Sequence, residues 1–170
     1  MVTMKKFLII GNINAVACKE VFPLIKDNKM WLGCSLHATK CNFIVSNDYD
    51  SSNTFVDKDG IKKAKINNAV WFTNLEHTKI HDPIDLYKRY TPEEYPKYDN
   101  YDAINVDKTC EIPMDHDSVM GVPITFLDKY CKDQFEIIGY ACNGSNNQFD
   151  YCKPIIKGKN IYKRLLIKRR

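Results

Sequence analysis

The side chains best suited to chemistry in this sequence are cationic and lie near its carboxyl end. Eight lysines and arginines, and no acidic residue, occupy residues 153–170. The preceding 152 residues carry 17 basic and 21 acidic side chains, a net charge of −4. Such a basic end can hold a phosphate backbone, although a solvated, solubilising tail has the same composition. The candidates for phosphate contacts are Lys159, Lys163, Arg164, Lys168, Arg169 and Arg170.

Amide side chains precede this basic segment, in the run NGSNNQ at residues 143–148. Asparagine and glutamine can pair with the edge of an adenine, so a loop of this kind can read bases. We therefore take Asn146, Asn147 and Gln148 as candidates for base contacts. An ordinary amide-rich turn is the alternative.

The cysteines and histidines offer weaker chemistry. Seven scattered cysteines without a C-x-x-C pair favour free thiols in a reducing compartment. Cys34, His37 and Cys41 have a loosely metal-like spacing, and His77 and His81 are four residues apart. Neither set has the further ligands of a structural zinc site, so we expect no metal. A cysteine nucleophile paired with a histidine stays open, and no cysteine is singled out.

Length and composition limit the class of protein. A chain of 170 residues that is 44% hydrophobic and 27% charged suits one globular domain over residues 1–170. No apolar run approaches the roughly 20 residues that span a bilayer. The opening MVTMKKFLII is too short, and lacks the cleavage site, for a secretory signal. We expect a cytoplasmic protein without a membrane partner.

The first element that could position these side chains is a strand followed by a helix. Residues 7–10 form a continuous apolar run, which predicts a strand buried on both faces within a parallel sheet. Asn14 can cap the following helix, in which Pro23 predicts a kink or a restart. One apolar stripe at helical spacing is made by Cys18, Val21, Phe22 and Ile25.

The rest of the chain reads as short strands and irregular segments. We predict a hairpin turn at Asp59–Gly60, and a short helix with an extended loop over residues 82–102. A second short helix is expected within residues 121–130. The carboxyl end is predicted to be a hairpin at a sheet edge, turning at Gly158–Lys159. Strands are expected at residues 30–36, 41–48, 66–76, 103–106 and 135–141.

Five strings of the sequence are long and idiosyncratic. They are KKFLIIGNINAV at 5–16, WFTNLEH at 71–77, YPKYDNYDAI at 95–104, VMGVPITFLDKY at 119–130 and KGKNIYKRLLIKR at 157–169. Together they resemble the adenine-specific DNA methyltransferases of the EcoRI modification-methylase type, in order and over nearly the whole chain. The resemblance implies an α/β fold: a partial Rossmann-like class I methyltransferase sheet with an irregular, strand-rich DNA-recognition region.

The motifs that come first in that family are absent. Its members carry a glycine-rich S-adenosylmethionine segment and then an Asn-Pro-Pro-Phe motif, and only afterwards a strand like residues 7–10. This sequence has no Pro-Pro pair, and its seven glycines are too dispersed for a G-x-G cradle. The resemblance thus implies the carboxyl-terminal part of a restriction-modification adenine N6-methyltransferase. Its partners would be duplex DNA and a separately encoded amino-terminal half.

We expect this part to be inactive alone, with S-adenosylmethionine bound only in the complete enzyme. A strand without its parallel neighbours would leave apolar surface uncovered, which predicts self-association, marginal stability or a partner. A non-catalytic DNA-binding module and the product of a decayed, truncated gene are the alternatives.

The resemblance also suggests residues near the reacting base. Trp71 or Phe72 would pack against the flipped target base, unless they simply fill the core. Asn12 and Asn14 follow the first strand, at the edge where ligands bind in α/β sheets, so they could face the cofactor or the base. Helix capping explains Asn14 equally well.

Overall fold

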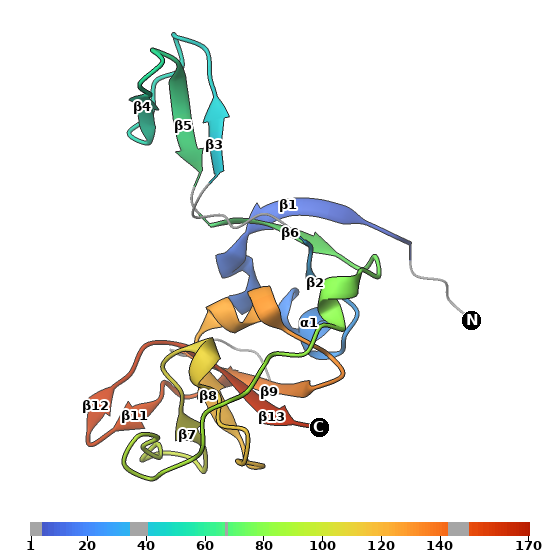
Figure 1. The fold of residues 1–170 in the computed structure, drawn as a ribbon, viewed down its shortest axis with the longest axis vertical. Coiled ribbons are helices and arrows are strands. Elements are labelled where there is room, and N and C mark those ends of the chain that lie inside the picture. Colours follow the sequence, from blue (N-terminus) through green and yellow to red (C-terminus); the bar gives the residue numbers. More distant parts are fainter. Residues whose placement is uncertain (1–4, 35–40, 67, 143–149) are drawn as a thin grey trace.

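The computed structural model describes residues 5–34, 41–66, 68–142 and 150–170. A mixed α/β body carries most of the elements, and a small sheet projects from it (Figure 1). One hydrophobic cluster runs through the body and includes Phe22, Phe72, Val122, Phe135 and Leu165. None of the helices in these ranges is long and apolar enough to cross a membrane.

The largest sheet has five strands in the order β10–β9–β13–β8–β7. They are β7 (Ile104–Asn105), β8 (Met120–Val122), β9 (Phe135–Ala141), β10 (Asp150–Tyr151) and β13 (Arg164–Arg169). Strand β13 runs antiparallel to β8 and β9, whereas the outer pairs β10–β9 and β7–β8 are parallel. The strands predicted at residues 103–106 and 135–141 are therefore confirmed.

Strand β13 corrects the expectation of a carboxyl-terminal sheet edge. It occupies the centre of its sheet, and Leu165, Leu166 and Ile167 are at most 1% exposed. A strand with partners on both sides and apolar side chains packed on both faces is buried at every residue. Exposed and buried residues therefore do not alternate along β13.

The predicted hairpin does form just before β13. It pairs β11 (Ile155–Ile156) with β12 (Lys159–Asn160). Lys157 and Gly158 both have positive φ, at 50° and 72°, as a type I′ turn requires, so the turn lies one residue earlier than predicted. The hairpin is anchored to the body because the backbone N–H of Gly158 donates to Asp99 Oδ2 at 2.8 Å.

A second, three-stranded sheet has the order β1–β6–β2. Its strands are β1 (Leu8–Asn12), β2 (Trp31–Leu32) and β6 (Ala69–Thr73), and both pairings are antiparallel. The strands expected within residues 30–36 and 66–76 are thus confirmed. The prediction of a first strand buried in a parallel sheet is wrong for this chain, because β1 is an edge strand with β6 beside it. Its Leu8, Ile9 and Ile10 are 53%, 54% and 59% exposed.

The helix after β1 is divided in two. A 3₁₀ helix, η1 (Ile13–Ala17), precedes α1 (Phe22–Lys26), which begins with Pro23 in its first turn. The predicted restart at Pro23 is confirmed, since proline is favourable where no intrahelical donor is needed. The cap is Asn12 rather than Asn14: Asn12 Oδ1 accepts from the backbone N–H of Asn14 at 2.9 Å. Of the predicted stripe, Phe22 and Ile25 are buried.

The remaining described helices are short 3₁₀ segments: η2 (Thr78–Ile80), η3 (Thr109–Glu111) and η4 (Ile124–Lys129). The helix expected within residues 121–130 is therefore present as η4. The helix expected within residues 82–102 is absent from that described stretch. The stretch is irregular, with a turn at residues 92–94 and isolated bridges from Lys88 to Pro113 and from Lys97 to Ile104. Three prolines in that stretch remove the donors that a helix would need.

The projecting sheet has the order β3–β5–β4 and stands at the top of Figure 1. It consists of β3 (Cys41–Ile44), β4 (Thr54–Val56) and β5 (Lys62–Ile66). Gly60 adopts a φ of 77°, which confirms the predicted turn. Of the side chains described in these strands, Ala64 is the buried one. The hairpins are therefore held mainly by backbone pairing, with little core of their own.

Candidate nucleic-acid interface

Arg164 differs from the other cations of the basic segment, because it is 8% exposed and all three of its side-chain nitrogens donate within the chain. Its Nε donates to Asn105 Oδ1 at 3.1 Å, and its Nη2 to Asp107 Oδ1 at 3.1 Å. Its Nη1 lies 3.3 Å from the carbonyl oxygens of Tyr162 and Lys163. Four contacts within the chain thus occupy most of the five N–H groups of the guanidinium, so a phosphate contact at Arg164 would compete with them and stays a prediction. Arg164 stabilises the start of β13.

The same polar network reaches the neighbouring strands. Tyr98 donates from its hydroxyl to Asn105 Oδ1 at 2.9 Å, and burial raises the pKa of that phenol far above its ordinary value. Asn105 in turn donates from Nδ2 to Asp107 Oδ1 at 2.8 Å. Gly121 gives Tyr98 its room, since a Cβ there would lie 2.1 Å from the hydroxyl oxygen. The network therefore locks β7, β8 and β13 together and fixes the segment that leads into β13.

That fixed segment presents exposed cations. Lys159 on β12 and Lys163 just before β13 are both exposed, as is Lys157 at the hairpin turn. Tyr162 lies between them in sequence and is 72% exposed. An aromatic ring among cations is a common composition of surfaces that bind nucleic acids. We call Lys157, Lys159, Tyr162 and Lys163 the hairpin patch.

The other predicted cations lie at the opposite end of β13. Lys168 is exposed, whereas Arg169 donates to the carbonyl of Met114 and lies 3.8 Å from Asp117. Arg170 is exposed and its Nε donates to the carbonyl of Phe135 at 3.3 Å. A strand of this length separates the hairpin patch from these cations by roughly 17 Å. The structure thus divides the predicted basic segment into two groups.

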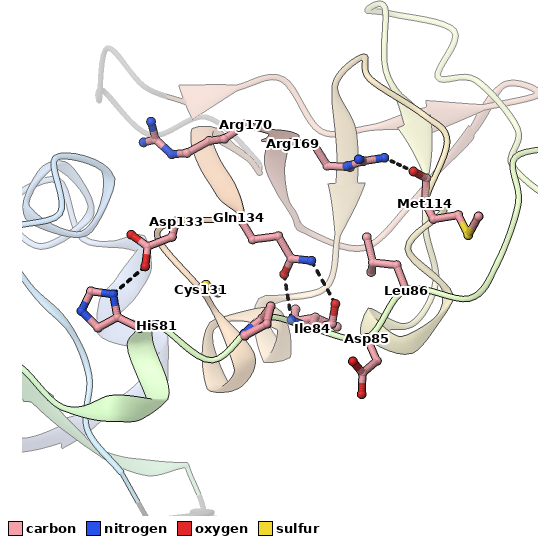
Figure 2. Close-up of a pocket in the computed structure, with 11 residues that line it drawn as sticks. His81, Ile84, Asp85, Leu86, Met114, Cys131, Asp133, Gln134, Arg169 and Arg170 are labelled. Carbon is pink, nitrogen blue, oxygen red and sulfur yellow. Dashed lines mark hydrogen bonds and ion pairs between the residues drawn. The ribbon is translucent and has the colours of Figure 1, made fainter.

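An open cavity of about 610 Å³ adjoins Arg169 and Arg170 (Figure 2). Gln134 shapes its wall by clamping Ile84: the backbone N–H of Ile84 donates to Gln134 Oε1 at 2.8 Å, and Gln134 Nε2 donates back to the carbonyl at 2.9 Å. Asp85 and Asp133 also line the cavity. The lining therefore has both signs of charge, and it is not a purely anionic or cationic site.

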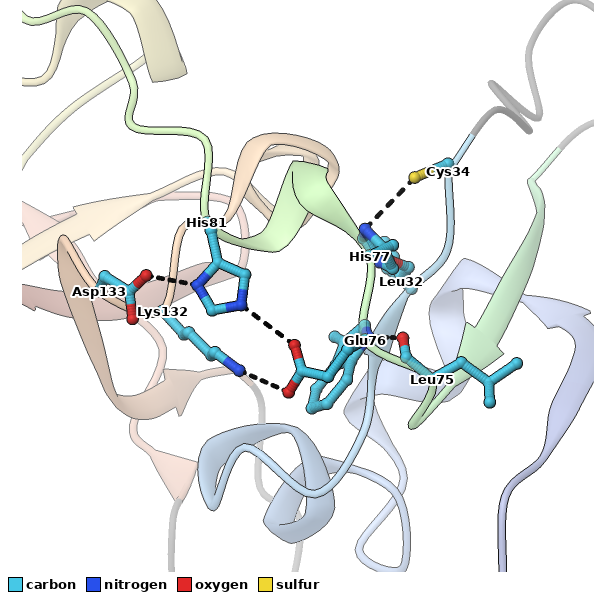
Figure 3. A network of polar contacts seen from close by, with 9 residues as sticks. Leu32, Cys34, Leu75, Glu76, His77, His81, Lys132 and Asp133 are labelled. Atoms are coloured by element: carbon cyan, nitrogen blue, oxygen red, sulfur yellow. Dashed lines mark hydrogen bonds and ion pairs between the residues drawn. The ribbon is translucent and has the colours of Figure 1, made fainter.

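Asp133 also belongs to a polar cluster with Glu76, His81 and Lys132 (Figure 3). His81 Nδ1 lies 2.5 Å from Asp133 Oδ2, and its Nε2 lies 3.1 Å from Glu76 Oε2. Hydrogen bonds that His81 donates to these two carboxylates raise the pKa of its imidazole. Lys132 Nζ bonds Glu76 Oε1 at 2.8 Å and lies 5.1 Å from the centre of the Trp31 ring. We call these four residues the His81 clip, because they join the two sheets of the body.

The structure does not bring together the other histidines and cysteines that were considered as metal ligands. His77 and His81 flank η2 but contact different partners. Among the residues that the structure describes, no three His, Cys, Asp or Glu side chains are placed to hold a metal ion. His37 lies outside the described residues, as do Asn146, Asn147 and Gln148.

The residues expected near a target base lie on opposite faces of β6. Phe72 is 6% exposed and belongs to the hydrophobic cluster, so the core-filling alternative applies to it. Trp71 is half-buried and paired with Ile10, whose side chain is 59% exposed, on the face turned away from that core. Asn12 and Asn14 are both exposed at the end of β1. Of these two aromatic side chains, Trp71 is therefore the more accessible to a ligand.

Comparison with known families decides what kind of chain this is. The family model described as "Adenine-specific methyltransferase EcoRI" matches residues 1–170, the whole length. The chain belongs to this family. Its resemblance to EcoRI-type methylases, inferred from five strings of sequence, is thereby confirmed.

Curated relatives of this EcoRI-type methylase chain are all named Type II methyltransferases. M.EcoRI of Escherichia coli is 46% identical over 168 residues, which cover 96% of the chain and 50% of that protein. M.MpnI of Mycoplasma pneumoniae is 36% identical over 182 residues, 98% of the chain and 57% of the relative. M.MgeORF184P of Mycoplasma genitalium is 38% identical over 145 residues, which cover 82% of the chain and 45% of that relative. The chain spans about half the length of these relatives, and no solved structure matches it.

Sequence reasoning missed several residues that shape this EcoRI-type methylase chain. Asn105, Asp107 and Gln134 are ordinary polar residues whose partners lie far along the sequence. The nearest signal was the unusual string at residues 95–104, whose Tyr98 reaches the network beside Arg164. Pairings between remote segments carry no local pattern, so only the folded chain reveals them.

Proposed function

We propose that this chain is the carboxyl-terminal part of an AdoMet-dependent DNA adenine N6-methyltransferase of a restriction-modification system, acting in the cytoplasm and inactive alone. The observation that carries the proposal is the exposure of β1. Leu8, Ile9 and Ile10 are each more than half exposed, in a family whose relatives are about twice as long. The part of those relatives that this chain does not match is the natural cover for this strand.

The edge of β1 supports a specific mode of docking. Among the described strands β1 pairs with β6 alone, so its other edge has free backbone donors and acceptors. A strand of an amino-terminal half laid along this edge would satisfy them and extend the sheet toward the Rossmann-like form expected of the complete enzyme. Covering three large aliphatic side chains would contribute about 1 kcal/mol or more for each.

The cofactor would be held largely by that amino-terminal half. Asn12 and Asn14 are exposed at the end of β1, and Asn12 Oδ1 is already occupied by its cap contact. They can supply amides to S-adenosylmethionine but do not enclose a pocket. The cofactor supplies the methyl group when bound, and the residues of this chain would only border its site. No cofactor is therefore expected on the isolated chain.

Duplex DNA is the proposed macromolecular partner. The hairpin patch, through Lys159 and Lys163, and the far group of Lys168, Arg169 and Arg170 would contact phosphates at two points. Trp71 is the proposed packing partner of a flipped adenine, because it is half-buried whereas Phe72 lies in the hydrophobic cluster. Asn146, Asn147 and Gln148 remain proposed base contacts.

Complementation tests this function. The chain is mixed with the amino-terminal half of M.EcoRI, duplex DNA and methyl-labelled AdoMet, and label in DNA is counted. We expect methyl transfer only when both pieces are present. Ile10→Asp on β1 should lower that transfer at least about tenfold, since a desolvated charge at the junction costs more than 1.4 kcal/mol. The control is Val56→Asp, at a residue that is 63% exposed on β4 and should leave transfer unchanged.

The other outcomes separate the alternatives. Salt-sensitive DNA binding without complementation would favour a non-catalytic DNA-binding module. Neither DNA binding nor complementation would favour a decayed gene product. Equal loss in Ile10→Asp and Val56→Asp would contradict the docking edge while leaving the enzymatic proposal intact.

A further inference from the structure

A thiol and an imidazole meet where β2 and β6 end. Cys34 Sγ lies 3.2 Å from His77 Nδ1, as Figure 3 shows. Cys34 follows β2 by two residues, His77 follows β6 by four, and the thiol is exposed. Neither residue belongs to the hairpin patch, the open cavity or the His81 clip.

The imidazole of His77 is held in the orientation that makes it a base. Its Nε2 lies 3.1 Å from the carbonyl oxygen of Leu32, which can only accept, so Nε2 carries the proton and donates it. In the neutral ring Nδ1 then has its lone pair free, and it accepts from the Cys34 thiol.

The strands fix this arrangement in place. Leu32 pairs with Phe72 in the β2–β6 ladder, so the carbonyl that orients His77 is part of a sheet. Trp31 adds a second tie, because its Nε1 donates to the carbonyl of Leu75 at 3.0 Å. A nucleophile, its base and a group that orients the base are thus set by backbone pairing.

We propose that Cys34 is a reactive thiol, a modification site for small disulfides and other soft electrophiles. The thiol proton passes to His77 Nδ1, and the resulting thiolate attacks one sulfur of the disulfide. A new sulfur–sulfur bond forms as the old one breaks, and the departing thiolate takes a proton from His77 or water. The product is a mixed disulfide at Cys34, reversible by an excess of free thiol.

The other cysteines provide a comparison within one molecule. Cys18, Cys110 and Cys152 are also exposed, and the structure gives none of these three a histidine contact within its described ranges. Cys131 is 1% exposed, so it should not react while the chain is folded. Exposure alone would make the first three as reactive as Cys34, whereas a base-assisted thiol should be distinctly faster.

The experiment uses the full 170-residue chain, reduced and then treated at pH 7 with a limiting amount of oxidised glutathione. Peptide mass spectrometry measures the initial rate of glutathione addition at each cysteine. We expect Cys34 to react at least about tenfold faster than Cys18, Cys110 and Cys152, because the thiolate fraction limits an unassisted thiol. Equal rates would overturn the proposal.

Two histidine variants assign the effect to its base. His77→Asn should lower the rate at Cys34 to that of the other exposed cysteines. The matched control His81→Asn removes a histidine four residues away that contacts carboxylates instead, and should leave the rate unchanged. An unreactive Cys131 in each variant shows that the fold is intact. A fast Cys34 in folded His77→Asn would contradict the role of His77. None of these readouts needs DNA or a partner, so the inference and the proposed function can fail separately.

Discussion

Two strands with similar runs of three large aliphatic residues differ completely in burial. Strand β1 contains Leu8, Ile9 and Ile10, at 53% to 59% exposed, and β13 contains Leu165, Leu166 and Ile167, at 0% to 1% exposed. Both are apolar runs preceded by two basic residues within three positions. Strand β13 has partners on both sides, whereas β1 has β6 on one side.

The difference shows that an apolar run predicts a tendency to be buried, and that the neighbouring strands decide whether burial is achieved. Strand β13 has its neighbours because residues 120–141 supply β8 and β9. Strand β1 has no second neighbour among the described residues. The curated relatives of this chain are about twice its length. The proposed function accounts for the exposed run as one half of an interface.

Matched truncations should give the largest contrast between the two strands. Leu165→Ala is expected to lower the free energy of unfolding by about 2–5 kcal/mol, through lost burial and a cavity. Leu8→Ala should change it by no more than about 0.5 kcal/mol, because that side chain is already half in water. Urea denaturation of the two variants measures both values. Similar losses would mean that β1 is covered by this chain itself or by a second copy.

A smaller contrast is expected between two cations of β13. Arg164→Ala should cost about 2 kcal/mol, because the buried Asn105 loses a charged donor and the exposed Asp107 loses its ion-pair partner. Lys168→Ala, four residues along the same strand, should leave stability unchanged. In DNA titrations against salt, Lys168→Ala should instead reduce the slope by about 1, as expected for a lost phosphate contact. If folded Arg164→Ala also showed a reduced salt slope, Arg164 would be identified as a DNA contact.

Most elements could be predicted from the sequence because their signals are local. The turn at Gly60, the restart at Pro23 and the strand at residues 135–141 rest on backbone freedom, ring geometry and β-branched content. The positions of β1 and β13 in their sheets could not be predicted, since they depend on remote strands. The helix expected within residues 82–102 failed for a related reason: this stretch is held by bridges to residues 104 and 113.

The candidate site was predictable only in part. The basic character of residues 153–170 follows from composition, and the exposure of Lys159, Lys163 and Lys168 agrees with it. Nothing local distinguishes Arg164 from these lysines, because its burial depends on Asn105 and Asp107. The contact between Cys34 and His77 likewise joins residues 43 positions apart.

The smallest expected effect concerns the His81 clip, which connects the sheet of β1 to that of β13. Its carboxylate partners raise the pKa of His81 above 6.5, so the folded chain holds that proton more tightly than the unfolded chain. The clip therefore stabilises the fold fully below about pH 6.5, and this contribution is lost as pH rises through the higher, folded pKa. Because His81 is exposed, solvent keeps the effect small.

His81→Gln isolates this contribution. Urea midpoints of the parent chain should fall slightly from pH 6 toward pH 8, and those of His81→Gln should lose that dependence on pH. His77→Gln is the matched control, since His77 contacts a thiol and a carbonyl rather than carboxylates, and it should keep the parental slope. If all three proteins changed alike, His81 would contribute nothing measurable to the connection between the two sheets. The connection would then rest on the shared hydrophobic cluster and on the Lys132–Glu76 ion pair, which does not titrate in this pH range.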